Sequence, residues 1–450
     1  MLTERKEEGQ QAQPGHLHAT YPLAPRTPEE TGLPFLFLVE LVSKTLFLRG
    51  QIRLLDLAAH LKLSSTIVDA VVSFMRAEKL CEVTRRGGSN TDIDLTFALT
   101  DVGRGRATEY LNRSAYAGPA PVTLYDYCSQ VEAQSVKQMN VLREDIAREF
   151  ESIVVNPLVL EKFGAAMNSG RAVFIHGPAG SGKTFLAERL AGLLKGDVWV
   201  PYAVLVDGEV IQIHDPAVHQ QSSGAAPQAS MIDKRNFPDP RWVHCVRPAV
   251  LTGGELTMNM LELQFDPGTR YYQAPPHLKA NNGLFIIDDL GRQRCSPAEL
   301  MNRWIVPLDR HTDHLALHTG HKFMVPFDVV VVFSSNFAPD QLADGAFLRR
   351  LGYKIEVGAQ TEAEYERIFR QTCSHYGVPY SDDAFQYLVH NKHSHEGRPL
   401  LACFPRDLIS QVRDLARYEG VAPTLNKQVL DWAWNNYFSV SQDQHGRQQC

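Results

Sequence analysis

The N-terminal third of the chain carries apolar residues with a helical period, followed by two short segments in which apolar and polar residues alternate. The helical period predicts three helices, over residues 35–48, 53–63 and 64–80. Ser64 or Ser65 is placed to cap the third helix, because a short hydroxyl side chain there can accept a backbone hydrogen bond. Segments 81–86 and 92–100 flank the turn-rich GGSN, and together they predict a β-hairpin.

Three helices and a hairpin in this order resemble a winged helix, a relative of the helix-turn-helix. We place this domain at residues 32–118. Residues 1–31 are rich in Gln, Pro, Glu and Gly and predict a disordered tail. Residues 119–141 predict a linker, on the strength of the stretch GPAPVTLYDYCSQ, residues 118–130. The expected arrangement is a small first domain joined loosely to the rest of the chain.

The charges on the third helix leave its role open. In a winged helix this element would read DNA, but here Asp69 and Glu78 offset Arg76 and Lys79, so the helix presents no net positive face to phosphate. Further positive charge comes from four arginines in and after the hairpin, Arg85, Arg86, Arg104 and Arg106. DNA binding and a role in protein contact or packing therefore both remain as hypotheses.

After the linker the chain is helical again over residues 143–150 and 158–167 and then meets an apolar strand. We place an α/β domain at residues 142–358, the bounds that the family resemblance described below implies. A helical region follows over residues 359–438, and residues 439–450 form a polar tail. Four segments in the helical region have the helical period, 361–377, 381–391, 403–420 and 424–438. The first opens with a capping box from Thr361 to Glu364.

The segment AVFIHGPAGSGKTFLAERLAGLL contains the spacing G-x4-G-K-[ST] between an apolar strand and an amphipathic helix. Glycines allow a tight turn whose backbone N–H groups point inward, and the helix N-terminus adds the positive end of its dipole. Lys183 can reach the terminal phosphates of a nucleotide, and Thr184 can offer its hydroxyl to Mg²⁺. We expect ATP to be held by Gly177, Pro178, Ala179, Gly180, Ser181, Gly182, Lys183, Thr184 and Phe185.

The segment LFIIDDLGR, residues 284–292, is an apolar strand that ends in two adjacent carboxylates. Like charges side by side need a cation, a proton or open water. In a P-loop nucleotidase, an acid that ends a neighbouring strand holds Mg²⁺ through water, which would give Asp288 its cation. Asp289 is then available to orient the attacking water or to accept its proton.

These motifs together resemble the AAA+ family of ring-forming ATPases, over about residues 142–438. The resemblance implies a P-loop α/β core with a parallel sheet and an α-helical lid, and it implies ATP and Mg²⁺ as cofactors. In that family the acid after the magnesium aspartate is usually Glu. This chain has Asp289, one methylene shorter, so we expect hydrolysis that is either slower or more dependent on neighbouring groups.

Three further stretches match the family in order and spacing. VVVVFSSN resembles sensor 1 and would place Asn336 beside the γ-phosphate and the attacking water. DGAFLRRLGYKIEV resembles the arginine-finger segment, where we favour Arg350 over Arg349 because the finger commonly precedes a large apolar residue. CFPRDLISQVRDLARYEG resembles sensor 2, with Arg406 at the opening of a helix. An arginine finger acts on the nucleotide of an adjacent subunit, so the resemblance implies a ring, with a hexamer expected.

The 104 residues between Lys183 and Asp288 exceed what a simple core needs, which indicates an insertion. Hairpins are predicted at 203–213, with Asp207-Gly208 at the turn, and at 314–325, with the turn at Thr319-Gly320. A flexible polar loop is predicted over His219 to Ser230.

The second hairpin resembles the pre-sensor-1 hairpin of the clade that includes the MoxR-type ATPases, and GELTMNMLEL resembles their helix-2 insert more weakly. His311, His314, His318 and His321 cluster there, with His318 and His321 expected to face each other across the turn. We favour a hydrated histidine-rich edge over a metal site. For the pair Tyr271-Tyr272, buried packing is favoured over gripping a polypeptide.

Composition limits the classes of partner. The net charge is −6, with 45 Lys and Arg against 51 Asp and Glu, so any polyanion site has to be local. Seven scattered cysteines without a CxxC pair fit reduced thiols. The N-terminus lacks the apolar core of a signal peptide, and no apolar run reaches the length of a membrane helix, so we expect a cytoplasmic protein without membrane insertion.

The sequence therefore predicts an ATP hydrolase that acts as a ring to remodel or assemble a protein client, in a chaperone-like way. The alternative is an ATP-regulated DNA-binding protein or loader that grips DNA with the winged helix. Salt-sensitive DNA affinity that is lost when Arg85 and Arg86 become Ala would favour the alternative.

Overall fold

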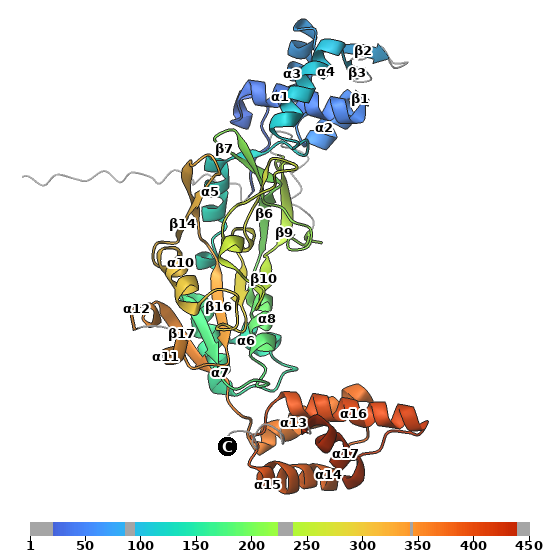
Figure 1. The fold of residues 1–450 in the computed structure, drawn as a ribbon, viewed down its shortest axis with the longest axis vertical. Helices are drawn as coiled ribbons and strands as arrows, with labels where there is room; N and C mark the ends of the chain where they lie inside the picture. Colours follow the sequence, from blue (N-terminus) through green and yellow to red (C-terminus); the bar gives the residue numbers. More distant parts are fainter. Residues whose placement is uncertain (1–20, 86–94, 224–236, 343–344, 439–450) are drawn as a thin grey trace, which may run out of the picture. The chain divides into compact units, whose positions relative to one another are not determined.

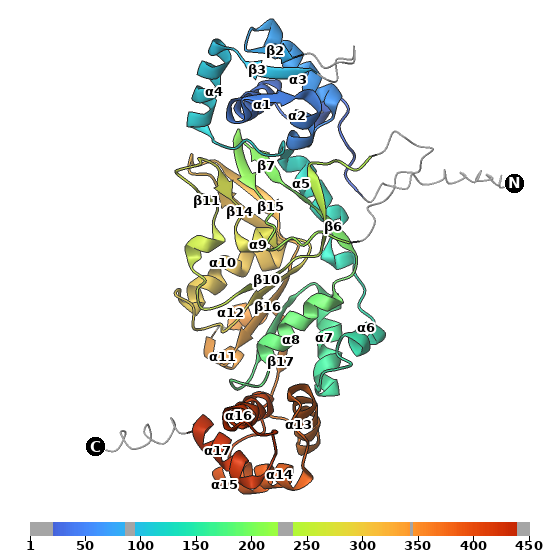
Figure 2. The ribbon, with the colours of Figure 1, turned by 90° about the vertical axis from the view of Figure 1, so that its right-hand side faces the viewer.

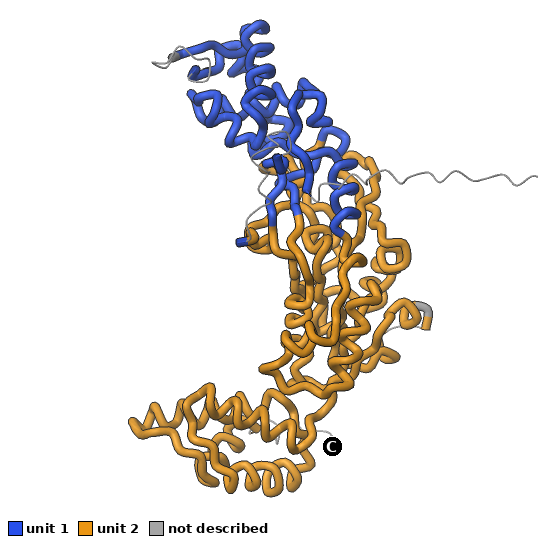
Figure 3. The backbone as a smooth tube through the Cα atoms, turned by 180° about the vertical axis from the view of Figure 1, so that it is seen from behind, with its two compact units in different colours: residues 1–134, 199–208, 223–244 blue, residues 135–198, 209–222, 245–450 orange. Residues whose placement is uncertain are grey.

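The computed structural model describes residues 21–85, 95–223, 237–342 and 345–438, and the chain divides into two compact units (Figure 3). Unit 1 comprises residues 1–134, 199–208 and 223–244, and unit 2 comprises residues 135–198, 209–222 and 245–450. Two pieces of the predicted α/β domain over 142–358 thus group with the N-terminal unit. Strands β6 Asp197–Pro201 and β9 Trp242–Val246 each run across a unit boundary.

Unit 1 begins with helices and a small three-stranded sheet (Figures 1 and 2). Its longer helices are α1 Phe35–Arg49, α2 Leu54–Leu61, α3 Ser65–Ala77, α4 Asp101–Arg113 and α5 Leu124–Ala133. The antiparallel strands β1 Gln51–Arg53, β2 Cys81–Arg85 and β3 Thr96–Leu99 pair in the order β1-β3-β2. Ser64 caps α3 by accepting a hydrogen bond of 3.4 Å from the backbone N–H of Ile67. The three predicted helices and both hairpin strands are confirmed, while the GGSN turn lies outside the described residues.

The linker predicted over 119–141 is instead regular structure. Strand β4 Val122–Thr123 pairs in parallel with β7 Ala203–Val206, and α5 follows directly. Thr123 caps α5 by accepting from the N–H of Asp126 at 3.0 Å, and Tyr127 and Val131 are buried. The linker prediction was wrong because it relied on the Gly and Pro residues before this segment. Thr123 followed three residues later by Asp126 is a helix-capping pattern, and it indicated the helix correctly.

The tail predicted over 1–31 is shorter than expected, since residues 21–31 pack against the inserted segment of unit 1. The backbone N–H of Ala24 donates to Phe237 at 3.0 Å, and the N–H of Asp239 donates to Pro22 at 2.8 Å. A 3-10 turn, Glu29–Thr31, follows. Residues 1–20 lie outside the described part of the chain.

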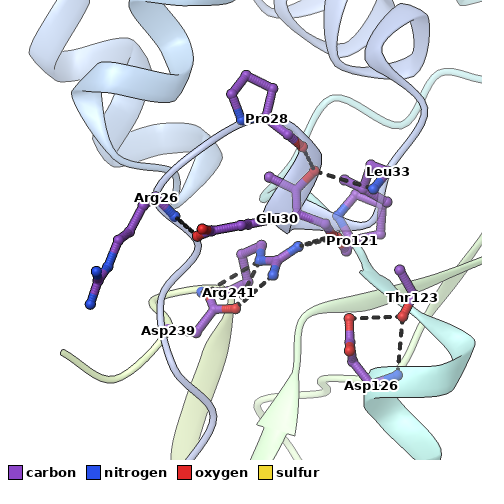
Figure 4. A network of polar contacts seen from close by, with 10 residues as sticks. Arg26, Pro28, Glu30, Leu33, Pro121, Thr123, Asp126, Asp239 and Arg241 are labelled. Atoms are coloured by element: carbon purple, nitrogen blue, oxygen red, sulfur yellow. Dashed lines mark hydrogen bonds and ion pairs between the residues drawn. The ribbon is translucent and has the colours of Figure 1, made fainter. Parts of the chain in front are cut away.

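A buried arginine joins three segments of unit 1 (Figure 4). Arg241 is 3% exposed, and its guanidinium makes a two-pronged ion pair with buried Asp239, with Nη2 to Oδ2 at 2.8 Å and Nε to Oδ2 at 3.0 Å. Its Nη1 donates to the carbonyl oxygens of Thr31 and Pro121, each at 3.2 Å. The inserted segment is therefore held to the N-terminal residues by charge-assisted hydrogen bonds.

Unit 2 is built on a five-stranded parallel sheet in the order β10-β13-β16-β5-β17. Three of these strands, β10, β16 and β17, are labelled in Figures 1 and 2. The strands are β5 Ala172–His176, β10 Ala249–Thr252, β13 Leu284–Ile287, β16 Val330–Ser335 and β17 Leu351–Glu356. The three central strands, β13, β16 and β5, are nearly continuous apolar runs because helices cover both faces, whereas the edge strands β10 and β17 alternate between buried and more exposed residues. The sequence led us to expect the P-loop strand β5 and the acid strand β13 to be neighbours. They are not, because β16 lies between them.

Alternate residues of each strand point to opposite faces and form two cores. On one face Val173 and Ile175 of β5 pack with α6, α7 and α8, and on the other Phe174 packs with Leu300 and Trp304 of α10. The helical elements of this part are α6 Arg143–Glu149, α7 Pro157–Ser169, α8 Lys183–Arg189, α9 Pro276–Lys279, α10 Pro297–Arg310, α11 Pro339–Leu342 and α12 Gly345–Leu348, with 3-10 turns at Val136–Gln138, Leu190–Leu193 and Met258–Leu261.

The predicted hairpin at 314–325 is confirmed. Strands β14 Thr312–Ala316 and β15 Lys322–Pro326 pair antiparallel, with Gly320 left-handed at the turn, φ 89°. The His318 ring stacks on Phe265 with centroids 4.3 Å apart, and the backbone N–H of His318 donates to the hydroxyl of buried Tyr272 at 2.8 Å. The expected pairing of His318 with His321 across the turn stays a prediction. Among the described residues there is no group of three metal-binding side chains that could hold an ion.

Smaller strands complete the insertion. They are β8 Glu209–Gln212, β11 Gln264–Phe265 and β12 Tyr272–Gln273, with β12 parallel to β8 and antiparallel to β11. Asp207 and Gly208, before β8, are both left-handed, with φ 50° and 79°, as the predicted turn requires. The predicted flexible loop over 219–230 falls partly outside the described residues, and its first residue, His219, is buried.

The C-terminal part of unit 2 is a helical bundle. Its helices are α13 Glu362–Tyr376, α14 Asp382–Gln386, a π-helical segment Tyr387–His393, α15 Ser394–Glu396, α16 Cys403–Glu419 and α17 Lys427–Phe438. The capping box is present, with Thr361 accepting from the N–H of Glu364 at 3.3 Å. Phe369, Phe385 and Trp434 lie in its core. The predicted fold class, a P-loop α/β core with a parallel sheet and a helical lid, is confirmed.

Within the described residues, no single helix has both the length and the apolar character needed to cross a membrane. One pair, Leu54–Leu61 with Ser65–Ala77, passes on length and composition alone, although it is bent by 114°. Six of the seven cysteines are described, and all six are free thiols.

Candidate nucleotide-binding site

The glycine-rich loop follows β5 and leads directly into α8. Gly177, Gly180 and Gly182 all have positive φ, at 148°, 87° and 94°, which L side chains rarely adopt. A Cβ on Gly177 would also collide with the carbonyl oxygen of Val357. The loop therefore needs glycine at these positions, and Gly182 serves as the N-cap of α8.

Lys183 is the best-connected side chain of the loop. It is 6% exposed, and its ammonium donates to the carbonyl oxygens of Gly177 at 3.0 Å and Pro178 at 2.9 Å, and to Asn336 Oδ1 at 2.8 Å. Burial lowers the pKa of Lys183, and the nearby charges of Asp289 and Asp288 oppose this shift. The ammonium is thus held inside the loop, where nucleotide phosphates would replace the two carbonyls as its partners.

The two predicted magnesium residues are in direct contact. The Thr184 hydroxyl donates to Asp288 Oδ2 at 2.7 Å. The other carboxylate oxygen, Asp288 Oδ1, is buried without a hydrogen-bond partner among the described residues. A buried carboxylate oxygen left in that state is costly, and a divalent cation fits it well. Ser181 Oγ, in the loop itself, is likewise buried and unpartnered in the described structure.

The remaining predicted catalytic pair also comes together. Asn336 Nδ2 donates to Asp289 Oδ1 at 3.1 Å, while its Oδ1 accepts from Lys183. Asp289 is left-handed, with φ 50°, a conformation that costs energy for a residue other than glycine. This turn separates the directions of the two adjacent carboxylates, so Asp288 faces Thr184 and Asp289 faces Asn336.

The geometry follows from the parallel sheet. In register, His176 of β5 lies beside Ser335 of β16, and Ile287 of β13 lies beside Phe333 of β16. The loops after β5, β13 and β16 therefore leave the same edge of the sheet. Helix α8 begins at this edge and places Lys183 and Thr184 opposite the other two loops, so contact does not require β5 and β13 to be neighbours.

The sensor 2 candidate sits on the helix that touches the loop. The N–H of Cys403 at the start of α16 donates to the carbonyl of Gly180 at 3.1 Å, and the Cys403 thiol lies where a Cβ of Gly180 would point. Arg406, one turn later, pairs with its neighbour Asp407 at 3.2 Å and is mostly exposed. Phe185 is partly exposed beneath the Arg189 guanidinium, 5.3 Å from the ring centre.

The arginine-finger candidates lie at the other end of the sheet. Arg349 and Arg350 directly precede β17, and Arg350 Nε pairs with Asp309 at 2.8 Å. Both line a polar cavity of about 710 Å³, together with Lys137, Arg171, His311 and Asp309. We call this the basal cavity. The structure thus gathers the loop, both acids and Asn336 at one edge, and separates them from Arg349 and Arg350.

Sequence reasoning did not single out Arg171 or Lys137 of the basal cavity. The available signal was positional: Arg171 immediately precedes the strand that leads to the glycine-rich loop, just as Arg350 immediately precedes β17. Residues before two neighbouring parallel strands must lie near each other. Nothing in the sequence indicated that Lys137, in a 3-10 turn, would join them.

A family model described as Domain of unknown function (DUF8689) matches residues 361–436, within the helical bundle. Among the curated proteins, no match was found. The chain is similar to the solved structure of NtrX from Brucella abortus in complex with ATP, at 16% identity and TM-score 0.38, over 64% of this chain and 57% of that chain. It is also similar to the RuvB Holliday junction branch migration motor of Thermotoga maritima, at 15% identity and TM-score 0.36, over 68% and 73%.

The chain therefore spans somewhat more than half the length of the NtrX chain. At these scores the likenesses add nothing to the assignment of the site. The evidence for a P-loop fold is the parallel sheet, the glycine-rich loop and the residues that meet at its edge.

Proposed function

We propose that the chain is a P-loop ATPase of the AAA+ type, which binds ATP with Mg²⁺ at residues 177–184 and hydrolyses it. The observation that carries this proposal is an unbroken set of contacts at one sheet edge. Thr184 contacts Asp288, while Asn336 joins Lys183 to Asp289. Residues from the loops after three strands converge there, as nucleotide hydrolysis requires.

The phosphates would be bound by backbone N–H groups of the loop and by the Lys183 ammonium, with the N-terminus of α8 adding its dipole. A magnesium ion held by Thr184 and Asp288 would supply positive charge against the phosphate oxygens. Asn336 and Asp289 would position a water molecule, whose oxygen attacks the γ-phosphorus as the bond to the β-phosphate oxygen breaks. The proton of that water would go to an oxygen of Asp289.

The arginines of the basal cavity support an oligomer. Arg349 and Arg350 lie at the N-terminal end of the sheet, whereas the chain's own glycine-rich loop lies at the C-terminal end. A finger arginine so placed would act on the nucleotide of a second copy, with each copy supplying a loop on one side and an arginine on the other. Repetition of such a head-to-tail contact generates a ring when the rotation between copies closes, and a hexamer is our working number.

For the ring's action we propose chaperone-like remodelling or assembly of a protein client in the cytoplasm, with unit 1 as the adaptor. Helices α1, α2 and α3 of unit 1 and its β1-β3-β2 antiparallel sheet come in the order that a winged helix would have, and we treat this part as one. The pre-sensor-1 hairpin assignment of β14 and β15, with its MoxR-type clade, belongs to the same proposal, as does a nucleotide-sensing role for Arg406. DNA binding by unit 1 stays the alternative, tested by salt-dependent affinity for duplex DNA.

The experiment that tests the proposed function is a steady-state ATPase assay on the purified full chain with Mg²⁺, paired with mass photometry. We expect ATP-dependent assembly and hydrolysis, and we expect Lys183→Ala to abolish hydrolysis. As a control, Lys322→Ala changes an exposed lysine of β15 and should hydrolyse normally. Equal rates for the wild type and Lys183→Ala would refute the assignment.

A further inference from the structure

The basal cavity is strongly cationic for a chain whose net charge is −6. Four basic side chains line it, Lys137, Arg171, Arg349 and Arg350, against one carboxylate, Asp309. Burial and the charge of Lys137 lower the pKa of His311, although Asp328 and Asp309 oppose the shift, so His311 adds little charge at neutral pH. With a volume of about 710 Å³, the cavity is the size of a small-molecule site.

The arginine at the start of the P-loop strand has a prepared place in this cavity. Strand β17 has an irregularity in its register with β5 between Leu351 and Tyr353. Gly352 lies at that point, and a Cβ on it would come 2.5 Å from Arg171 Cβ and 2.9 Å from Arg171 Cδ. Glycine is therefore needed for the stem of Arg171 to cross β17 beside Arg349 and Arg350.

The other charges of the cavity are arranged unevenly. The pair between Arg350 Nε and Asp309 neutralises part of one arginine and holds it on α10. Arg171, Arg349 and Lys137 then remain as positive charge facing the cavity. Arginine suits phosphate because its planar fork can donate two parallel hydrogen bonds.

The chain's own nucleotide is too far away to be the anion. Strand β5 separates Arg171 from Gly177, and an extended chain of this length covers about 20 Å. The phosphates at the loop of the same copy therefore lie well beyond hydrogen-bonding reach of Arg171. A second copy that docks head to tail can bring its own nucleotide to the cavity.

We propose that Arg171, with Lys137 in support, binds the nucleotide phosphates held by the glycine-rich loop of a second copy of this chain, beside Arg349 and Arg350. This inference rests on the proposed function and extends its intersubunit site from the finger arginines to the start of β5. Strand β5 would then connect two nucleotides. Arg171, just before its N-terminal end, would bind the phosphates of the neighbouring copy, and its C-terminal end leads into the chain's own glycine-rich loop. Free polyphosphate as the natural occupant is the rival that the test has to exclude.

The test uses Arg171→Ala in the full chain, which leaves the chain's own loop unchanged. We expect Arg171→Ala to bind a fluorescent ATP analogue as the wild type does. Its rate of ATP hydrolysis should be about tenfold lower, because one charge-assisted contact is lost. Arg171→Gln keeps the Cβ, Cγ and Cδ atoms that pass Gly352. The same loss of hydrolysis in this variant would show that the effect is not a packing defect. Arg148→Ala, which removes an exposed arginine of α6, is the matched control and should behave as wild type.

Mixing then shows whether Arg171 acts between copies. Arg171→Ala and Lys183→Ala, mixed in equal amounts before nucleotide is added, should recover roughly a quarter of wild-type hydrolysis, because a quarter of random head-to-tail contacts join an intact loop to an intact cavity. A parallel mixture of Arg350→Ala with Lys183→Ala reports that copies exchange.

The outcomes separate the two proposals. Recovery in the Arg350 mixture without recovery in the Arg171 mixture overturns the role of Arg171 between copies, as does a wild-type rate for Arg171→Ala alone. Inorganic triphosphate that binds the monomeric Lys183→Ala variant tightly, and loses that binding in Lys183→Ala with Arg171→Ala, would overturn it in favour of a free polyanion site. A wild type without any ATPase activity would instead refute the proposed function itself.

Discussion

The Thr184 hydroxyl donates a hydrogen bond of 2.7 Å to Asp288 Oδ2, although the strands that precede the two loops are separated by β16. This contact leaves the second oxygen of Asp288 buried and unpartnered among the described residues. A hydroxyl and a carboxylate so arranged form half of a hard-cation site, and phosphate oxygens and water can complete it.

The first prediction concerns this site. Asp288→Asn keeps an oxygen that can accept from Thr184, but it removes the negative charge that attracts a cation. We expect the Mg²⁺ concentration needed for half-maximal hydrolysis to rise about tenfold or more, as when a residue that orients a metal's ligands is lost. Magnesium titrations of the ATPase rate at saturating ATP measure this. An unchanged magnesium requirement would show that Asp288 is a structural acceptor for Thr184 alone.

The second prediction concerns Asp289. Asp289→Asn preserves an acceptor for Asn336 yet cannot take a proton, so the hydrolysis rate should fall by about 100-fold while ATP binding is kept. Asp289→Glu restores the longer side chain that is usual in the resembling family and should raise the rate above wild type. Single-turnover hydrolysis of radiolabelled ATP separates chemistry from binding. A wild-type rate for Asp289→Asn would favour a nucleotide-binding scaffold with slow turnover.

The third prediction is a loss of stability in acid through His219. Its Nδ1 accepts from the N–H of Asp215 at 2.9 Å and its Nε2 contacts the carbonyl of Lys279 at 2.9 Å, an arrangement that requires the neutral ring. Burial lowers the pKa of His219 to about 4, and the charge of His214 lowers it further. The hydrogen bonds to Lys279 and Asp215 and the negative charge of Asp215 oppose this lowering. Because the folded pKa is depressed below that of the unfolded chain, the stability is present above pH 6.5 and is lost as the pH falls towards 4.

At pH 5 this single group should cost about 2 kcal/mol relative to pH 7.5. His219→Gln, whose amide can donate and accept without titrating, should lose less stability over the same range. Urea unfolding of both proteins at the two pH values measures the difference. If the two proteins lose equal stability on acidification, His219 is not responsible.

The fourth prediction concerns the buried pair of unit 1. Arg241→Ala leaves the Asp239 carboxylate buried without its partner, and we expect a loss of about 3–5 kcal/mol in the free energy of unfolding. Replacing both residues, by Arg241→Met with Asp239→Asn, removes the uncompensated charge and should be less harmful than Arg241→Ala alone. Urea denaturation followed by circular dichroism checks the order of stabilities, and a double variant no more stable than Arg241→Ala would contradict the cost of the unpaired carboxylate.

Much of the candidate site was predictable because its residues lie at the ends of apolar strands. The spacing at Gly177 and Lys183, the acids after Ile287 and the amide after Ser335 are local signals, and a parallel sheet brings such strand ends to one edge. Strand order is a non-local property, so nothing before Asp288 or Asn336 indicated which strand would neighbour β5. For this reason the sequence wrongly predicted that β13 would be the neighbour of β5.

The parts that sequence could not supply depend on pairings between distant segments. Arg241 and Asp239 look like ordinary surface charges in sequence, and their role appears only when Thr31 and Pro121 are seen beside them (Figure 4). The α5 helix was hidden by nearby Gly and Pro residues. The position of Arg171 depends on Gly352, which leaves room for the Arg171 side chain because it has no side chain of its own. A missing side chain gives no chemical signal in the sequence.

The central claim is that residues 177–184 and Asp288 together hold ATP with Mg²⁺. Isothermal titration of the full chain with a non-hydrolysable ATP analogue, with Mg²⁺ and then with EDTA, tests it most directly, with Lys183→Ala and Lys322→Ala as the matched pair. We predict binding by the wild type and by Lys322→Ala that weakens when Mg²⁺ is removed, and none by Lys183→Ala. Binding that is the same in all three proteins, or indifferent to Mg²⁺, would contradict the account.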